Sequence, residues 1–142
     1  MAESTDYKAF RRNMPKPNDR LERIENLVGV GQPDTNYCAA GKECWIEFKS
    51  PKEPKRHSTP LFGSNHRLSQ DQMNWFLKQR NAGGVGFVLI VTDKRWILVD
   101  GCKYGDDIND MTVGHLLDVA EWYANKPLRK DDWINLRTAI II

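Results

Sequence analysis

The apolar positions of the chain first mark out its strands. Residues 44–50 (CWIEFKS) form a bulky, β-prone run, and residues 86–92 (GFVLIVT) are apolar almost without interruption. The first pattern predicts a central strand, and the second predicts a strand buried on both faces of a sheet. A polar pair at 93–94 then precedes residues 95–101 (RWILVDG). This order predicts that 95–101 returns as the hairpin partner of 86–92.

A different periodicity predicts three helices. In 20–28 (RLERIENLV) the apolar residues fall on one helical stripe, which predicts an amphipathic helix. Residues 69–84 begin with Ser69 and carry Gln72 at the third helical position, the arrangement of a capping box, and end at two glycines. A third helix is expected over 112–125, with a threonine cap and a proline following it.

The remaining segments lack a regular pattern. Residues 1–17 are polar, basic and interrupted by prolines, and are expected to form a weakly ordered arm. Residues 51–67 (PKEPKRHSTPLFGSNHR) are expected to form one long loop, and such loops are often functional. The tail, 131–142 (DDWINLRTAIII), is expected to form an edge strand or a subunit contact. With the segment between Asp34 and a turn near Gly41 as the hairpin partner of 44–50, the order is α-β-β-α-β-β-α, which predicts an α/β domain with helices on both sides of a mixed sheet.

Composition limits the class of protein. With 142 residues, 40% apolar and 28% charged, the chain suits one domain, 1–142, with its own core. Three cysteines (Cys38, Cys44 and Cys102) without a C-x-x-C pair argue against a zinc site or a disulfide framework and favour reduced thiols. Neither a secretory signal nor an apolar run long enough to span a bilayer is present. We therefore expect a cytoplasmic protein that does not enter a membrane.

Net charge is only +2, but basic residues are unevenly distributed. They gather near the N-terminus and in the 51–67 loop, where they are candidates for contacts with DNA phosphates. The candidates are Arg11, Arg12, Lys52, Lys55, Arg56, His57 and Arg67. Basic clusters of this kind are also common in solvated surface loops that bind nothing. The histidines, including His66, are expected to be ordinary surface residues.

Two acids and a lysine carry the candidate chemistry. Asp34 follows Pro33, and Glu47 and Lys49 share one face of the 44–50 strand, since side chains alternate along a strand. A hairpin turning near Gly41 would bring Asp34 back toward Glu47. Adjacent carboxylates repel unless a cation lies between them, and oxygen ligands suit Mg²⁺ or Mn²⁺. With a lysine beside the metal, these are the groups needed to hydrolyse a phosphodiester. On its own, an acid-x-Lys strand is usually just a solvated face.

These motifs together resemble the PD-(D/E)XK nuclease superfamily, and in particular the small stand-alone VRR-Nuc-type nucleases of phages and bacteria. The matching residues, within 23–91, are RIEN, GQPD, WIEFKS, LSQDQMNWF and AGGVGFVLI. The resemblance implies a restriction-endonuclease-like fold. One departure is the short segment between Glu25 and Asp34, where many relatives have a strand and this chain has room only for a turn.

The resemblance also implies roles for individual residues. Asp34, Glu47 and the backbone carbonyl of Phe48 would bind Mg²⁺ or Mn²⁺, and Lys49 would assist the attacking water or the phosphate. Glu25 would be an accessory acid on the preceding helix, with Glu22 facing solvent. Gln72 would orient the site, although a plain capping role stays open and Gln70 is a weaker candidate.

For the substrate, the resemblance implies a homodimer that cuts branched DNA, such as a Holliday junction. Flap, nick or duplex cleavage are alternatives, as are a non-catalytic DNA-binding protein and a plain interaction module.

Overall fold

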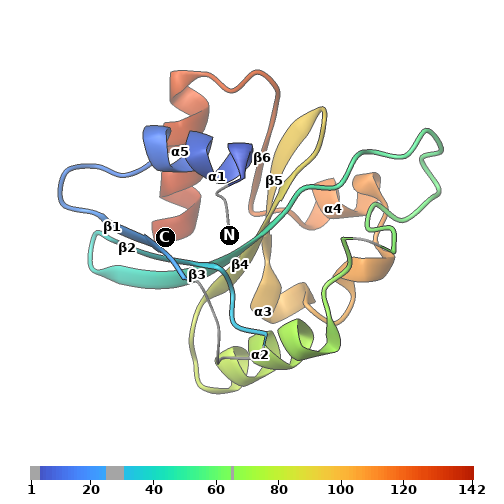
Figure 1. The fold of residues 1–142 in the computed structure, drawn as a ribbon, viewed down its shortest axis with the longest axis horizontal. Coiled ribbons are helices and arrows are strands. Elements are labelled where there is room, and N and C mark those ends of the chain that lie inside the picture. Colours follow the sequence, from blue (N-terminus) through green and yellow to red (C-terminus); the bar gives the residue numbers. More distant parts are fainter. Residues whose placement is uncertain (1–3, 25–30, 65) are drawn as a thin grey trace.

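The computed structural model describes residues 4–24, 31–64 and 66–142, which form a mixed six-stranded sheet between two layers of helices (Figure 1). The strands lie in chain order, and neighbours are antiparallel except for the parallel pair β3–β4. The strands are β1 (Arg20–Arg23), β2 (Thr35–Ala39), β3 (Lys42–Lys49), β4 (Gly86–Val91), β5 (Arg95–Asp100) and β6 (Trp122–Asn125). The helices are α1 (Thr5–Asn13), α2 (Gln70–Asn81), α3 (Gly101–Tyr104), the 3₁₀ turn η1 (Ile108–Asp110), α4 (Val113–Val119) and α5 (Lys130–Ile141).

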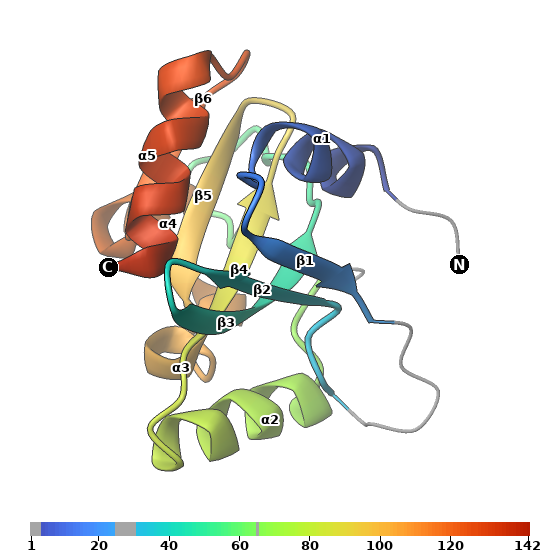
Figure 2. The ribbon, with the colours of Figure 1, turned by 90° about the vertical axis from the view of Figure 1, so that its left-hand side faces the viewer.

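Each face of the sheet has its own core. Helices α1 and α5 lie on one side and α2 and α3 on the other, as the two views show (Figures 1 and 2). The first core joins Phe10 of α1 and Leu136 of α5 to alternate residues of the central strands. The second joins Phe76 of α2 and Leu116 of α4 to the residues between them. Strand β4 is buried along its whole length because both faces are covered.

This arrangement gives β3 two different faces. Ile46 and Phe48 belong to the first core, whereas Glu47 and Lys49 lie on the side of α2. The crossover from β3 through α2 to the parallel strand β4 sets the start of α2 beside the end of β3. The expected alternation of the strand is therefore confirmed, and it directs both charged side chains toward one helix terminus.

The α/β class, with a mixed sheet between helices, is confirmed, as are the strands near 44–50, 86–92 and 95–101 and the helix beginning after Ser69. All three cysteines are free. The expected helix over 20–28 is wrong in its first part, which is strand β1; its remainder from 25 lies outside the described residues. Pairing of β1 with β2, Leu21 opposite Tyr37, overrides the helical periodicity.

Three other expectations are corrected. Residues 1–17 are not a weakly ordered arm throughout, because α1 is capped by Ser4 and buries Tyr7 and Phe10. The helix expected over 112–125 stops at Val119, and the edge strand β6 follows it. The tail is helix α5 rather than an edge strand, with Leu136 and Ile140 buried against the sheet. These corrections extend the order of elements without changing the class.

Candidate active site

The hairpin register brings the two acids of the site together. Thr35 pairs with Ile46, so the preceding residue, Asp34, lies level with Glu47 just beyond the paired part of the hairpin. The Ile24 N–H donates to the Asp34 carbonyl at 2.7 Å and holds the segment in place from the β1 side. On the other side, Gly31 has φ +79°, and a Cβ there would overlap the backbone carbonyl of Asp71 in α2. This close approach fixes the Asp34 segment against the first turn of α2.

The carboxylates of the half-buried Asp34 and the buried Glu47 repel each other. The Asp34 carboxylate accepts from the backbone N–H of Phe48 and from the Thr35 hydroxyl at 3.0 Å. The Glu47 carboxylate accepts from the backbone N–H of Asp34. Burial raises the pKa of Asp34, and burial together with the charge of Asp34 raises the pKa of Glu47 to about 8. The pair therefore retains a proton near neutral pH unless another positive charge replaces it.

Lys49 and Gln72 complete a connected polar group around Glu47. The Lys49 Nζ lies 3.8 Å from Glu47 Oε2 and donates to Gln72 Oε1 at 3.2 Å. The Gln72 Nε2 donates to Glu47 Oε2 at 3.3 Å. Gln72 Oε1 also accepts from the Ser69 N–H at 2.9 Å, closing the capping box of α2. The predicted cap and the predicted orienting residue are thus the same side chain.

Arg23 is a residue of this site that the sequence analysis missed. Its charge lowers the pKa of both Asp34 and Glu47, and its guanidinium lies 5.0 Å from the centre of the Tyr7 ring. Its NH1 nitrogen is buried and has no hydrogen-bond partner within residues 4–24, 31–64 and 66–142. Arg23 therefore acts on the two carboxylates through its charge, while its guanidinium packs beside Tyr7 on the α1 side of the sheet. Only knowledge that 20–23 is a strand pairing with β2 would have pointed to it.

The oxygen donors fit a hard divalent cation. Asp34 and Glu47 offer two neighbouring carboxylates, and burial raises the pKa of both. The backbone N–H of Phe48 turns toward Asp34, and in a strand the carbonyl of the same residue faces the same edge. Within 4–24, 31–64 and 66–142, no group of three His, Cys, Asp or Glu side chains forms a metal cluster. Such a cation would thus bind two carboxylates, a carbonyl and water, as Mg²⁺ commonly does.

Other predicted site residues lie around this centre or outside it. Glu25 lies outside the described residues, so its role stays a prediction. Glu22 is exposed and pairs with Arg20 at 3.1 Å, as a solvent-facing acid should. Gln70 bonds Asn74 rather than the site.

The loop between β3 and α2 carries most of the predicted DNA-contacting residues. Its described part contains no helix or strand, and Leu61 and Phe62 anchor it in the second core. Glu53 fixes its start through an ion pair with Arg95 at 2.8 Å. Lys49 Nζ reaches the Arg67 carbonyl at 3.4 Å, so the end of the loop adjoins the site. The predicted contact residues are all exposed, on the loop (Lys52, Lys55, Arg56, His57 and Arg67) or on α1 (Arg11 and Arg12).

Comparison with known proteins adds little to these observations. No family model and no curated protein matches the sequence. One similar solved structure is Hjc, a Holliday junction resolvase from the archaeal hyperthermophile Archaeoglobus fulgidus, with 19% identity and a TM-score of 0.42. The match covers 58% of this chain and 62% of that one, less than two thirds of the resolvase. Within the described part of the chain, every helix is too short or too polar to cross a membrane.

Proposed function

We propose that this chain is a divalent-metal-dependent endonuclease that hydrolyses phosphodiester bonds in DNA. One observation carries the proposal: Asp34, Glu47, Lys49 and Gln72 come from three segments and meet in one connected group of charges and hydrogen bonds. A solvated acidic strand would not bury Glu47 to 7% exposure beside a second carboxylate. Perturbed carboxylates with a specific charged partner are typical of functional sites.

The metal would be Mg²⁺ or Mn²⁺, held by the carboxylates of Asp34 and Glu47 and the carbonyl of Phe48. Bound there, it supplies positive charge at the scissile phosphate and makes nearby water more acidic. Its positive charge would offset the burial and the repulsion from Asp34 that together raise the pKa of Glu47.

The chain's own residues then have separate tasks. Lys49 Nζ stabilises the negative charge that grows on the phosphate as water attacks phosphorus and the P–O bond to the leaving strand breaks. Gln72 holds Lys49 and Glu47 in one orientation through its two amide atoms. The positive charge of Arg23 favours the ionised forms of Asp34 and Glu47 that a metal would bind. Glu25 is the accessory acid.

For the substrate we favour branched DNA, with a four-way junction first. The 51–67 loop ends at Arg67, whose carbonyl accepts from Lys49, and its exposed basic residues suit contacts to phosphates without regard to sequence. A homodimer would present two such sites to two strands, as a Holliday junction resolvase requires. Flap, nick or duplex cleavage uses the same site. The proposed setting is the cytoplasm of a bacterium or of a phage-infected cell.

The proposal is tested by cleavage of a four-way junction, a flap, a linear duplex and a single strand with Mg²⁺ or Mn²⁺. We expect paired symmetric cuts in the junction, reduced by roughly 10²-fold or more in Asp34→Asn and Lys49→Ala. Matched controls are Asp71→Asn and Lys78→Ala, exposed residues of α2 that should cut like the unaltered chain. Thermal unfolding of each variant verifies that it is folded.

Different results discard different parts of the proposal. Cutting of flaps or duplexes without preference for the junction would leave the site and overturn the substrate. Binding of DNA without metal and without any cutting would instead identify a non-catalytic DNA-binding protein.

A further inference from the structure

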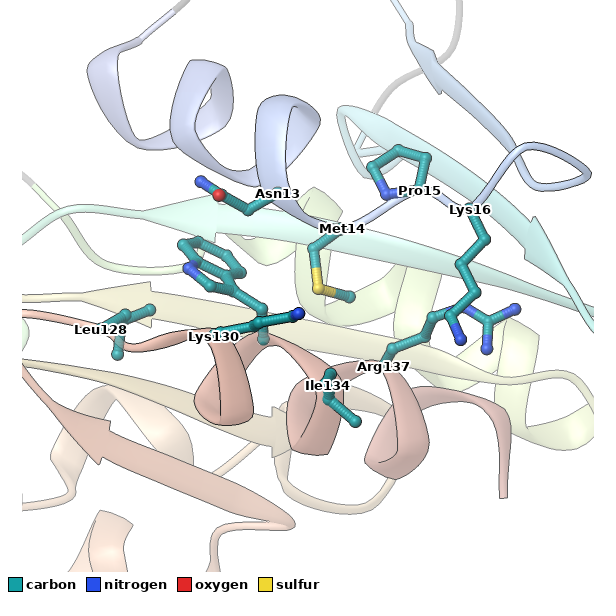
Figure 3. A pocket seen from close by; sticks show the side chains of 9 residues that line it. Asn13, Met14, Pro15, Lys16, Leu128, Lys130, Ile134 and Arg137 are labelled. Carbon is teal, nitrogen blue, oxygen red and sulfur yellow. The ribbon is translucent and has the colours of Figure 1, made fainter.

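The opposite face of the sheet carries a groove that the proposed reaction does not use. It runs between α1 with the residues that follow it and the segment 126–137. Two hollows, of about 330 Å³ and about 660 Å³, share Asn13, Leu128 and Trp133 as lining residues, so they are parts of one groove. Figure 3 shows Met14 and Lys16 on one side of the smaller hollow, across from Lys130 and Arg137 of α5. We call this feature the α1–α5 groove.

Its walls carry an excess of positive charge. Arg12 and Lys16 lie on the wall formed by α1 and its continuation, and Lys126 and Lys130 lie on the facing wall. In the part of the chain that the structure describes, none of these four side chains forms an ion pair or hydrogen bond. Such a row of unpaired cations on both walls matches an extended polyanion better than a single small anion.

The remaining charges of the groove are already engaged. Arg137 is paired with Asp19 through two hydrogen bonds of 2.9 Å. Asp6, the acid that lines the groove, accepts from the Ser50 hydroxyl at 2.7 Å. Ser50 directly follows Lys49, so this end of the groove begins close to the candidate active site.

The groove also has an apolar and aromatic lining. Trp133 lines both hollows and is held edge-on against the buried Trp96, with ring centroids 5.1 Å apart. Leu128 lines both hollows beside it. An aromatic ring between rows of cations is the arrangement used for single-stranded nucleic acid, in which bases stack on rings and phosphates meet Lys or Arg. In a duplex both faces of each base are covered by neighbouring bases, so only unpaired bases can meet Trp133.

We propose that the α1–α5 groove binds an unpaired segment of a DNA strand, with phosphates at its four free cations and a base against Trp133. This binding is separate from the proposed hydrolysis, because the groove lies on the other face of the sheet from Glu47 and Gln72 and needs no metal. A branched substrate contains such unpaired segments where its arms meet or a flap leaves the duplex. The groove would receive one of these unpaired segments where the DNA strand leaves the candidate active site near Ser50.

The test measures binding of fluorescein-labelled oligo-dT by anisotropy, in EDTA, in an Asp34→Asn background that cannot cut. We expect Lys16→Glu/Lys130→Glu to weaken binding at least tenfold. The control, Lys78→Glu/Lys103→Glu, makes the same change of charge at two exposed lysines on the opposite side of the sheet and should change it less than twofold. Trp133→Leu keeps an apolar side chain and should weaken binding about tenfold by removing the stacking ring.

The outcomes separate this inference from the proposed nuclease. An equal loss of oligo-dT binding in the groove variants and the control variant would overturn the proposal that the groove binds DNA, even if the unaltered chain cuts junctions. Binding of oligo-glutamate as tight as oligo-dT, with no effect of Trp133→Leu, would also overturn it and assign the groove to an acidic peptide. A selective loss in the groove variants would support the groove whether or not any DNA is cut.

Discussion

At the scale of single residues, the site is defined by how Asp34 and Glu47 share charge. Glu47 is buried and Asp34 half-buried, the Asp34 carboxylate accepts the Phe48 N–H and the Glu47 carboxylate accepts the Asp34 N–H, and both pKa values are raised. Lys49 and Arg23 lower these pKa values, yet the pKa of Glu47 stays near 8. The folded chain without metal therefore binds a proton at this pair that the unfolded chain does not bind at neutral pH.

This difference predicts how stability depends on pH in the absence of metal. A carboxyl with a folded pKa of about 8 and an ordinary value of 4.5 stabilises the fold fully below pH 4.5 and loses that contribution as pH rises through 8. We expect the free energy of unfolding in EDTA to fall between pH 6 and 9 on this account by on the order of a few kcal/mol. Glu47→Gln, which cannot ionise, should remove most of the fall, and urea titrations at each pH measure it.

Metal should reverse the same effect. Mg²⁺ binds the deprotonated pair, so its affinity should rise with pH up to about 8, and saturating Mg²⁺ should restore stability at pH 8 to 9. The control is Glu43→Gln, an exposed acid on the same strand. If the free energy of unfolding depends on pH in the same way in Glu47→Gln and Glu43→Gln, the carboxylate pair is not the group that titrates.

At the scale of elements, α2 links the stability of a helix to the geometry of the site. Ser69 and Gln72 form its capping box, and Gln72 reaches from that cap to Lys49 and Glu47. Ser69 and Gln72 contribute equally to capping the helix, but only Gln72 contacts Lys49 and Glu47. Replacing each in turn therefore separates the two roles.

We expect Ser69→Ala and Gln72→Ala each to lower the free energy of unfolding by about 1 kcal/mol, because each removes one half of the capping box. Only Gln72→Ala should also reduce cleavage, by roughly 10- to 100-fold, since residues that orient metal ligands typically contribute this much. Urea unfolding and initial cutting rates measure the two effects. Equal losses of rate in both variants would mean that Gln72 acts only as a cap.

The elements also explain what the sequence could and could not predict. The shared face of Glu47 and Lys49 and the capping role of Gln72 were predictable because strand alternation and a capping box are local rules, whereas the place of Gln72 beside them was expected only from the family resemblance. Arg23 was not, because its place depends on pairing with a strand twelve or more residues away, while its own segment has helical periodicity. Helices α1 and α5 did carry a usable local signal: their buried residues Phe10 and Met14, or Leu136 and Ile140, recur four positions apart. The prolines after α1 instead suggested a weakly ordered arm, and the isoleucines of α5 suggested an edge strand.

At the scale of the whole molecule, one ion pair joins the two ends of the chain. Asp19, just before β1, accepts two bonds from Arg137 of α5, and the Tyr37 hydroxyl of β2 donates to the same carboxylate at 2.5 Å. The side chain of Asp19 is only 2% exposed, and its hydrogen bonds with Arg137 hold its pKa well below the usual range. This contact fixes α5 against the β1–β2 edge of the sheet. Arg137 also lines one end of the α1–α5 groove there.

Arg137→Met leaves Asp19 buried without its cation, and we expect it to cost about 3–5 kcal/mol at pH 7. Because the folded pKa of Asp19 is depressed, the pair stabilises the fold above about pH 4, and that contribution is lost as pH falls through the folded pKa. The gap in unfolding free energy between the unaltered chain and Arg137→Met should therefore narrow from pH 5 to pH 2, as measured by urea unfolding. The double variant Asp19→Asn/Arg137→Met, which removes both charges, should recover part of the loss at pH 7. A gap that stays constant with pH would show that Arg137 stabilises α5 by packing alone.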